Sequence, residues 1–201
     1  MKPHLAILHV NTVPAEIFAG FLQTVNVDGL SVHVESRESG GIFAAIEWLI
    51  PTAVFAYISK SYFDAFLKEM GKDHYALLKK GLNSLYSKVL GPQAPEITLI
   101  STAGKVKGDQ PYSLYYSIVA ELEGGHQIKL LLARTSSEEE YEASVSAFLS
   151  LVERIHTKTL DTATLNALKT VRVAGRTLLV AYNPATEKVE TIDPLPKRDT
   201  K

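Results

Sequence analysis

The sequence predicts an α+β fold of mixed α/β character. We expect an N-terminal strand–helix–strand unit, a helical block, and then a mainly antiparallel sheet with a long packed helix and a C-terminal hairpin. Three observations predict this order. An apolar run is followed by helix-start residues and an alternating segment. An alternating segment and a returning strand flank Gly124-Gly125, and a capping sequence precedes a long apolar stripe.

Composition limits the class of protein. The 201 residues are enough for one domain, because a chain of this size buries roughly 70% of the surface that its unfolded form exposes. Hydrophobic residues make up 46% and charged residues 21%, which argues against disorder. The net charge of −1 predicts no nonspecific binding to nucleic acid. We expect a single domain over residues 1–193 and a flexible polar tail at 194–201.

The N-terminal unit is predicted from its pattern of apolar residues. Residues 5–10 are apolar on both faces, as in a strand that is covered on both sides. Thr12 and Pro14 begin a helix, because proline needs no N–H partner in the first turn. Residues 30–37 then alternate between apolar and polar side chains. The unit is therefore predicted to be a parallel β–α–β unit.

Residues 42–90 are predicted to be a helical block inserted between two β regions. Its first part, residues 42–58, is apolar nearly all round and has the minimum length for crossing a bilayer, about 17 residues. Glu47 would cost about 2.5–3.5 kcal/mol in a bilayer centre, and Pro51 weakens a straight helix. We therefore expect a central core helix, with membrane association or a partner groove as the alternatives.

The second β region begins with a predicted strand at 97–101. Residues 112–122 and 127–134 are predicted to form a hairpin, because Gly124-Gly125 between them suits a tight turn.

The last third of the chain is predicted to contain two helices and a hairpin. Ser137 and Glu140 form a capping box for a long helix, and Asp161 caps a short one. Residues 176–182 and 188–192 are predicted to form the C-terminal hairpin.

The common catalytic motifs are absent from the sequence. It contains no HExxH, GxSxG, P-loop or GxGxxG pattern. The absence of cysteine excludes disulfides, thiolate catalysis and Cys-ligated metal sites. We expect no metal and no cofactor. A chain without cysteine and without a signal-peptide pattern fits a soluble protein in the reducing cytoplasm.

The candidate catalytic residues are His9, His33, Glu35 and Arg37. His33, Glu35 and Arg37 share one face of a predicted strand, and His9 ends the neighbouring strand. One histidine and one carboxylate within reach of each other are sufficient for general acid–base chemistry. The alternative is that these residues are the ordinary polar face of a strand.

Three functions remain open from the sequence. The first is a non-catalytic binding or regulatory module that acts on a protein partner or by self-association. Residues 59–91 contain six Lys against three acidic residues, and residues 121–142 contain six Glu against two basic ones. Such opposed charges can steer a partner. The second is a small-molecule enzyme that uses the four candidate residues, and the third is a membrane-associated effector that uses residues 42–58.

Overall fold

The computed structural model describes residues 2–38, 52–66, 72–91, 94–95, 111–170, 173 and 175–193. In chain order the elements are β1 (Leu5–Val10), the 3-10 turn η1 (Ala15–Phe18), α1 (Ala19–Val25), β2 (Val32–Arg37), β3 (Val54–Ile58), the π-helical turn η3 (Tyr62–Phe66), α3 (Lys72–Leu90), β4 (Tyr112–Glu121), the 3-10 turn η4 (Glu123–Gly125), β5 (Gln127–Ala133), α4 (Glu138–His156), α5 (Thr162–Thr170), β6 (Thr177–Asn183) and β7 (Lys188–Ile192).

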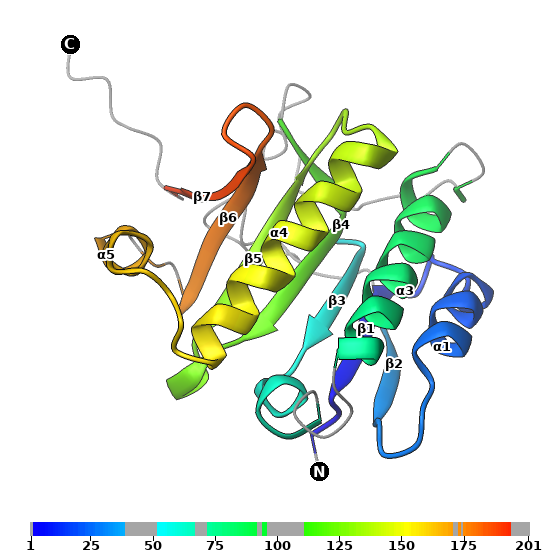
Figure 1. Cartoon of the computed structure of the whole chain (residues 1–201). Helices are drawn as coiled ribbons and strands as arrows, with labels where there is room; N and C mark the ends of the chain where they lie inside the picture. The colour runs from blue at the N-terminus through cyan, green and yellow to red at the C-terminus, as the bar shows by residue number, and fades with distance from the viewer. Residues whose placement is uncertain are drawn as a thin grey trace.

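The described strands form one seven-stranded sheet in the order β2-β1-β3-β4-β5-β6-β7. Parallel and antiparallel pairs alternate across it, beginning with the parallel pair β2–β1 and ending with the antiparallel pair β6–β7. Helices α1, α3 and α4 lie across one face of the sheet (Figure 1). The predicted α+β class and the N-terminal strand–helix–strand unit are confirmed.

Strand β3 corrects the prediction of a helix over residues 42–58. Val54–Ile58 is a strand between β1 and β4, antiparallel to the first and parallel to the second. Val54, Ala56 and Ile58 are buried among the core side chains, and Phe55 and Tyr57 point to the opposite face. A central strand with apolar residues on both faces has no polar alternation, so its pattern cannot be told from that of a buried helix.

Three sequence predictions fall on residues outside the described part of the chain. These are the first part of the apolar stretch, which includes Glu47, the strand at 97–101 and the tail at 194–201. Among the described residues, no helix combines the length and the apolar character needed to cross a lipid bilayer.

The core lies between the sheet and the helices. From the sheet, Ile7, Ile118 and Leu130 are fully buried, and they belong to the same cluster as Leu82 of α3 and Phe148 of α4. The apolar sides of α3 and α4 therefore face the sheet, as expected for amphipathic helices.

Helix α4 begins with the capping box that its sequence predicts. The Ser137 hydroxyl accepts a hydrogen bond from the Glu140 N–H at 3.1 Å, and the Glu140 carboxylate accepts one from the Ser137 N–H at 3.0 Å. At the other end Lys158 takes a left-handed conformation with φ 58°, and the Thr159 N–H donates to the Arg154 carbonyl at 3.0 Å. This backbone turn ends the helix and directs the chain toward α5.

Candidate functional site

The structure separates His9 from the other three predicted catalytic residues. His9 is on the helix-covered face of the sheet and is only 6% exposed. Its Nδ1 donates to the Val10 carbonyl at 2.9 Å, and its ring lies 4.6 Å from that of Phe18. His9 is therefore a hydrogen-bonded residue of the core, on the face opposite to His33.

His33, Glu35 and Arg37 are exposed together on the other face of β2. The Arg37 Nε lies 3.7 Å from the Glu35 carboxylate, and its guanidinium stands 5.6 Å from the centre of the Phe55 ring. Glu35 and Arg37 also line a cavity on this face. The structure therefore does not bring His9 together with the other three residues, and an acid–base role for any of them stays a prediction.

The most apolar cavity described lies between the C-terminal part of α4, α5 and the beginning of β6. We call it the α5 pocket, and it has a volume of about 570 Å³, within the range of roughly 300–1,000 Å³ typical of small-molecule sites. Its described lining residues are Leu122, His126, Gln127, Arg154, Ile155, Lys158, Leu160, Leu165, Leu168, Val173, Arg176 and Leu178. Seven of these side chains are aliphatic, and none is a carboxylate.

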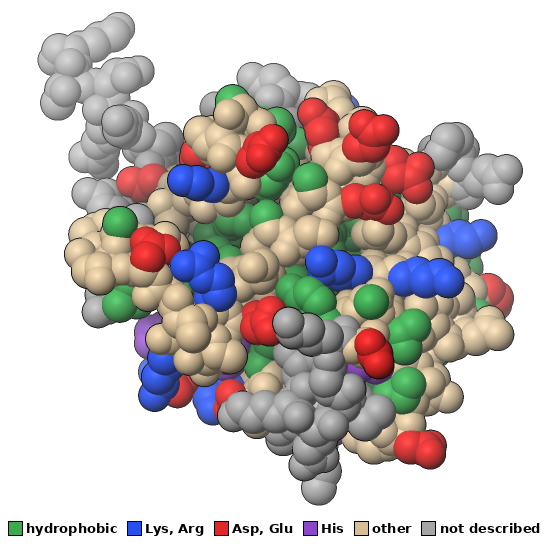
Figure 2. All heavy atoms as spheres, in the orientation of Figure 1, with side chains coloured by type: hydrophobic (Ala, Val, Ile, Leu, Met, Phe, Trp, Pro, Cys, Tyr) green, Lys and Arg blue, Asp and Glu red, His purple; other side chains and the backbone are tan. Residues whose placement is uncertain are grey.

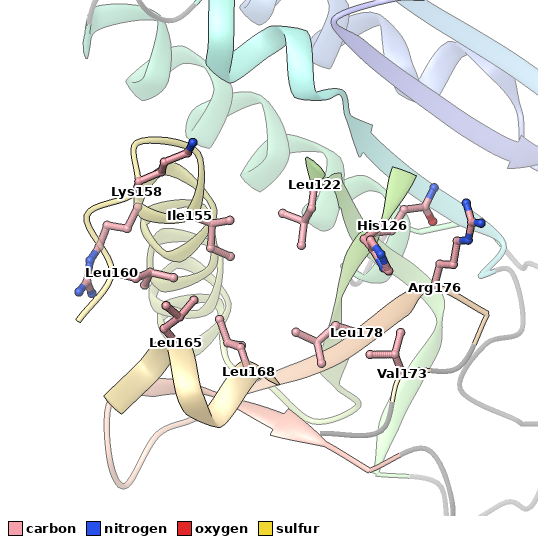
Figure 3. A pocket seen from close by; sticks show the side chains of 12 residues that line it. Leu122, His126, Ile155, Lys158, Leu160, Leu165, Leu168, Val173, Arg176 and Leu178 are labelled. Atoms are coloured by element: carbon pink, nitrogen blue, oxygen red, sulfur yellow. The ribbon is translucent and has the colours of Figure 1, made fainter. Parts of the chain in front are cut away.

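The aliphatic side chains of the α5 pocket come from separate elements and converge on one space. Figure 3 shows Ile155 of α4, Leu168 of α5 and Leu178 of β6 pointing toward one another. At the mouth, Leu165 is 37% exposed and Val173 is 48% exposed. These two are among the three large hydrophobic residues described as exposed, so the pocket opens to solvent through an apolar rim.

Positive charge surrounds this apolar space. Arg154 is paired with Asp161, with Nη2 3.0 Å from the carboxylate. Lys158 and Arg176 form no ion pair with any described residue, and they lie toward opposite ends of the pocket in Figure 3. His126 lies beside Arg176. The pocket therefore combines an apolar interior with cationic groups that can meet an anion.

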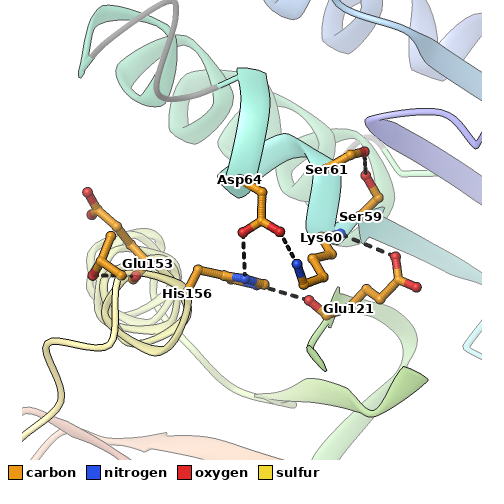
Figure 4. Close-up of polar contacts among 8 residues, drawn as sticks. Ser59, Lys60, Ser61, Asp64, Glu121, Glu153 and His156 are labelled. Carbon is orange, nitrogen blue, oxygen red and sulfur yellow. Dashed lines mark hydrogen bonds and ion pairs between the residues drawn. The ribbon is translucent and has the colours of Figure 1, made fainter. Parts of the chain in front are cut away.

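A polar cluster connects the two chain segments that contribute Leu122 and Ile155 to the α5 pocket. We define it as Lys60, Asp64, Glu121 and His156 (Figure 4). The His156 Nε2 donates to the Glu121 carbonyl at 3.0 Å, and its Nδ1 lies 3.5 Å from the Asp64 carboxylate. Asp64 is also bonded to the Lys60 ammonium. The cluster joins the last residue of α4 to the last residue of β4, and so positions the adjoining Ile155 and Leu122 in the pocket wall.

The charge state of His156 follows from its surroundings. The side chain is 3% exposed and is stacked 4.8 Å from the Phe63 ring. Burial lowers the pKa of His156 below its ordinary value, although Asp64 and the hydrogen bond to Glu121 act in the opposite direction. At neutral pH the ring is therefore neutral, with its proton on Nε2.

The opposed charges expected from the sequence lie on neighbouring helices. Figure 2 shows acidic side chains gathered over the first turns of α4, with lysines in a band beside them. The two helices are linked by the Asn83 amide, which donates to the Glu142 carboxylate at 2.8 Å. The acidic and the basic side chains lie on one face of the molecule, and a role for them in self-association stays a prediction.

The described residues contain no group of three or more His, Asp or Glu side chains that could hold a metal ion. The sequence matches no protein-family model, and neither a curated protein nor a solved structure is significantly similar to it.

The α5 pocket could not be predicted from the sequence, because its lining residues come from four separate elements. The sequence signal is local: Leu165 and Leu168 give the short helix after Asp161 an apolar side, and Leu160 comes just before that helix. What covers that side depends on the positions of α4 and β6, which the sequence pattern does not give.

Proposed function

We propose that the protein is a non-catalytic binding module whose α5 pocket holds a single-chain amphiphile with an anionic head group. The observation that supports it is the combination of seven aliphatic lining residues with cationic groups and no described carboxylate in the lining. An apolar chain buried in such a pocket gains about 0.8 kcal/mol per methylene. The head group gains from a charge-assisted contact with Arg176.

The cavity volume supports a ligand the size of one alkyl chain. A volume of about 570 Å³ lies within the range of roughly 300–1,000 Å³ typical of small-molecule sites. The exposed Leu165 and Val173 would then be covered by the first carbons of the chain, next to the head group.

The direct test is titration calorimetry with saturated fatty acids of 8 to 14 carbons, each kept below its micelle-forming concentration. We expect the dissociation constant to tighten about fourfold per added methylene until the chain fills the cavity. The matched uncharged alcohol is expected to bind about tenfold more weakly, and the matched alkyl-trimethylammonium more weakly still.

Two pairs of variants identify the site. Leu165→Gln places an amide at the apolar mouth and is expected to weaken binding about tenfold, whereas Tyr115→Gln, at a residue that is 40% exposed on β4 outside the pocket, leaves it unchanged. Arg176→Gln is expected to weaken binding of the acid but not of the alcohol. Lys188→Gln, at an exposed residue of β7, is the charge control.

Two results would contradict the proposal. The first is an affinity that does not depend on chain length. The second is a concentration-dependent dimer in light scattering that Leu165→Gln abolishes, because the apolar rim would then be an interface between protein chains. That outcome would favour the self-association expected from the sequence.

A further inference from the structure

Exposed aliphatic side chains gather at the mouth of the α5 pocket. Leu165 on α5 and Val173, which follows that helix, both line the pocket and are both exposed. The third large hydrophobic residue described as exposed is Tyr115, which lies on β4 outside the pocket. Exposed apolar side chains at the opening of an apolar cavity are typical of a surface that meets another apolar phase.

Unpaired positive charge borders these two side chains. Lys158 and Arg176 line the pocket, are exposed and form no ion pair with any described residue. Asp161, just before α5, is compensated by Arg154, whose Nη2 lies 3.0 Å from its carboxylate. The exposed Glu123 lies in the η4 turn and is not among the described lining residues. We define the pocket rim as Lys158, Leu165, Val173 and Arg176.

An anionic lipid bilayer matches both properties of the pocket rim. Its head groups attract Lys and Arg side chains, and its acyl chains accept aliphatic ones. A second copy of this chain is a poorer match, because a symmetric contact through the rim would bring like charges together. A bilayer is also where a single-chain amphiphile accumulates, so an opening that lies against it lets the apolar chain enter the pocket without passing through water.

We propose that the pocket rim docks on an anionic membrane surface, from which the α5 pocket takes its amphiphile. In the unliganded protein Leu165 and Val173 enter the boundary between head groups and acyl chains, and Lys158 contacts the head groups. This inference rests on the proposed function for the identity of the ligand, whereas docking is measured without any added ligand.

The test is co-sedimentation with vesicles of phosphatidylcholine, either alone or with about 30% phosphatidylserine. We expect at least tenfold stronger partitioning into the anionic vesicles, and a loss of this preference at high salt, because salt screens exposed charges. Val173→Gln is expected to weaken partitioning about tenfold. Tyr115→Gln is the matched control, at an exposed residue outside the rim, and should leave partitioning unchanged.

Lys158→Gln separates docking from ligand binding. The Lys158 ammonium points away from the aliphatic side chains of the pocket (Figure 3). The substitution is therefore expected to weaken partitioning about fivefold and to leave the calorimetric affinity for the fatty acid unchanged. Lys80→Gln, at an exposed residue of α3, is the charge control and should change neither measurement.

Equal partitioning of the unsubstituted protein and of Val173→Gln into anionic vesicles would overturn the proposal. Tighter binding to polyglutamate than to the anionic vesicles would also overturn it, because the rim would then fit an acidic protein partner. Vesicle binding that depends on the rim, without fatty-acid binding in calorimetry, would contradict the proposed function and support docking. Fatty-acid binding without vesicle binding would support the proposed function and overturn docking.

Discussion

Replacing Lys129 by methionine is expected to stabilise the protein at neutral pH. Lys129 holds its charge in the centre of the sheet, beside Val119 and Leu179, with 6% of the residue exposed. Methionine has a similar unbranched shape, so the substitution removes the charge without leaving a large cavity.

The size of the effect follows from the pKa. An ordinary lysine has a pKa of 10.5, and burial lowers that of Lys129 to about 8. Because one pKa unit corresponds to about 1.4 kcal/mol, holding the ammonium in the folded state costs roughly 3 kcal/mol of unfolding free energy at pH 7. Between pH 8 and 10.5 the unfolded chain binds more protons than the folded one, so the stability of the unsubstituted protein rises with pH. By pH 9.5 roughly 2 kcal/mol should be regained.

Urea unfolding of the protein and of Lys129→Met, measured from pH 7 to pH 9.5, tests this reasoning. The series stops there because burial raises the pKa of tyrosines such as Tyr116, and their titration in the unfolded state lowers stability above pH 10. We expect the variant to be more stable at pH 7 and the difference to shrink steadily toward pH 9.5. A difference that is constant over this range would refute the assignment of the cost to the buried charge.

Two further predictions concern the helices. Gly81→Ala places a Cβ 2.9 Å from a Val25 methyl group at the contact of α3 with α1, and should destabilise the protein by about 1–3 kcal/mol in urea unfolding, although alanine favours helix. Gly20→Ala, whose Cβ would meet its nearest neighbour at 3.5 Å, is the control and should be neutral or slightly stabilising; equal losses in both would count against the close approach. The unsubstituted protein should lose stability as the pH falls from 7 to 5. The reason is that His156 has a lowered pKa in the folded state, so the unfolded chain binds a proton first as the pH falls below 6.5. His156→Gln should make this loss of stability smaller. Superimposable pH profiles would show that His156 does not titrate as described.

The elements that depend on neighbouring residues could be predicted from the sequence. The capping box of α4 and the hairpin turn at Gly124-Gly125 each involve residues within a few positions of one another, and both were confirmed. Asp161 likewise caps α5 as predicted, because its carboxylate accepts a hydrogen bond from the Thr164 N–H at 2.8 Å.

The features that depend on distant segments could not be predicted in the same way. The sequence predicts a helix for the apolar run before Ser59, because its local pattern suits a buried helix as well as a buried strand. The run is a strand because it pairs with both β1 and β4, which are distant in sequence. Glu35 and Arg37 were identified as candidates, but the burial of Lys129 was not predicted, since it arises from strands on either side of β5. The sequence signal for Lys129 is a lysine within an otherwise apolar strand.

The position of β3 also bears on how the chain reaches its native state. Leu5 pairs with Ile58 and Val54 pairs with Tyr116, so this strand joins partners that are 53 and 62 residues away in sequence. Hairpins such as β4–β5 close over short loops and are expected to form early. A strand with two remote neighbours can pair only after two long loops have closed, so it is expected to form later. Until it inserts, β1 and β4 each present an unpaired apolar edge, and this interval is when the newly made chain is most prone to aggregate.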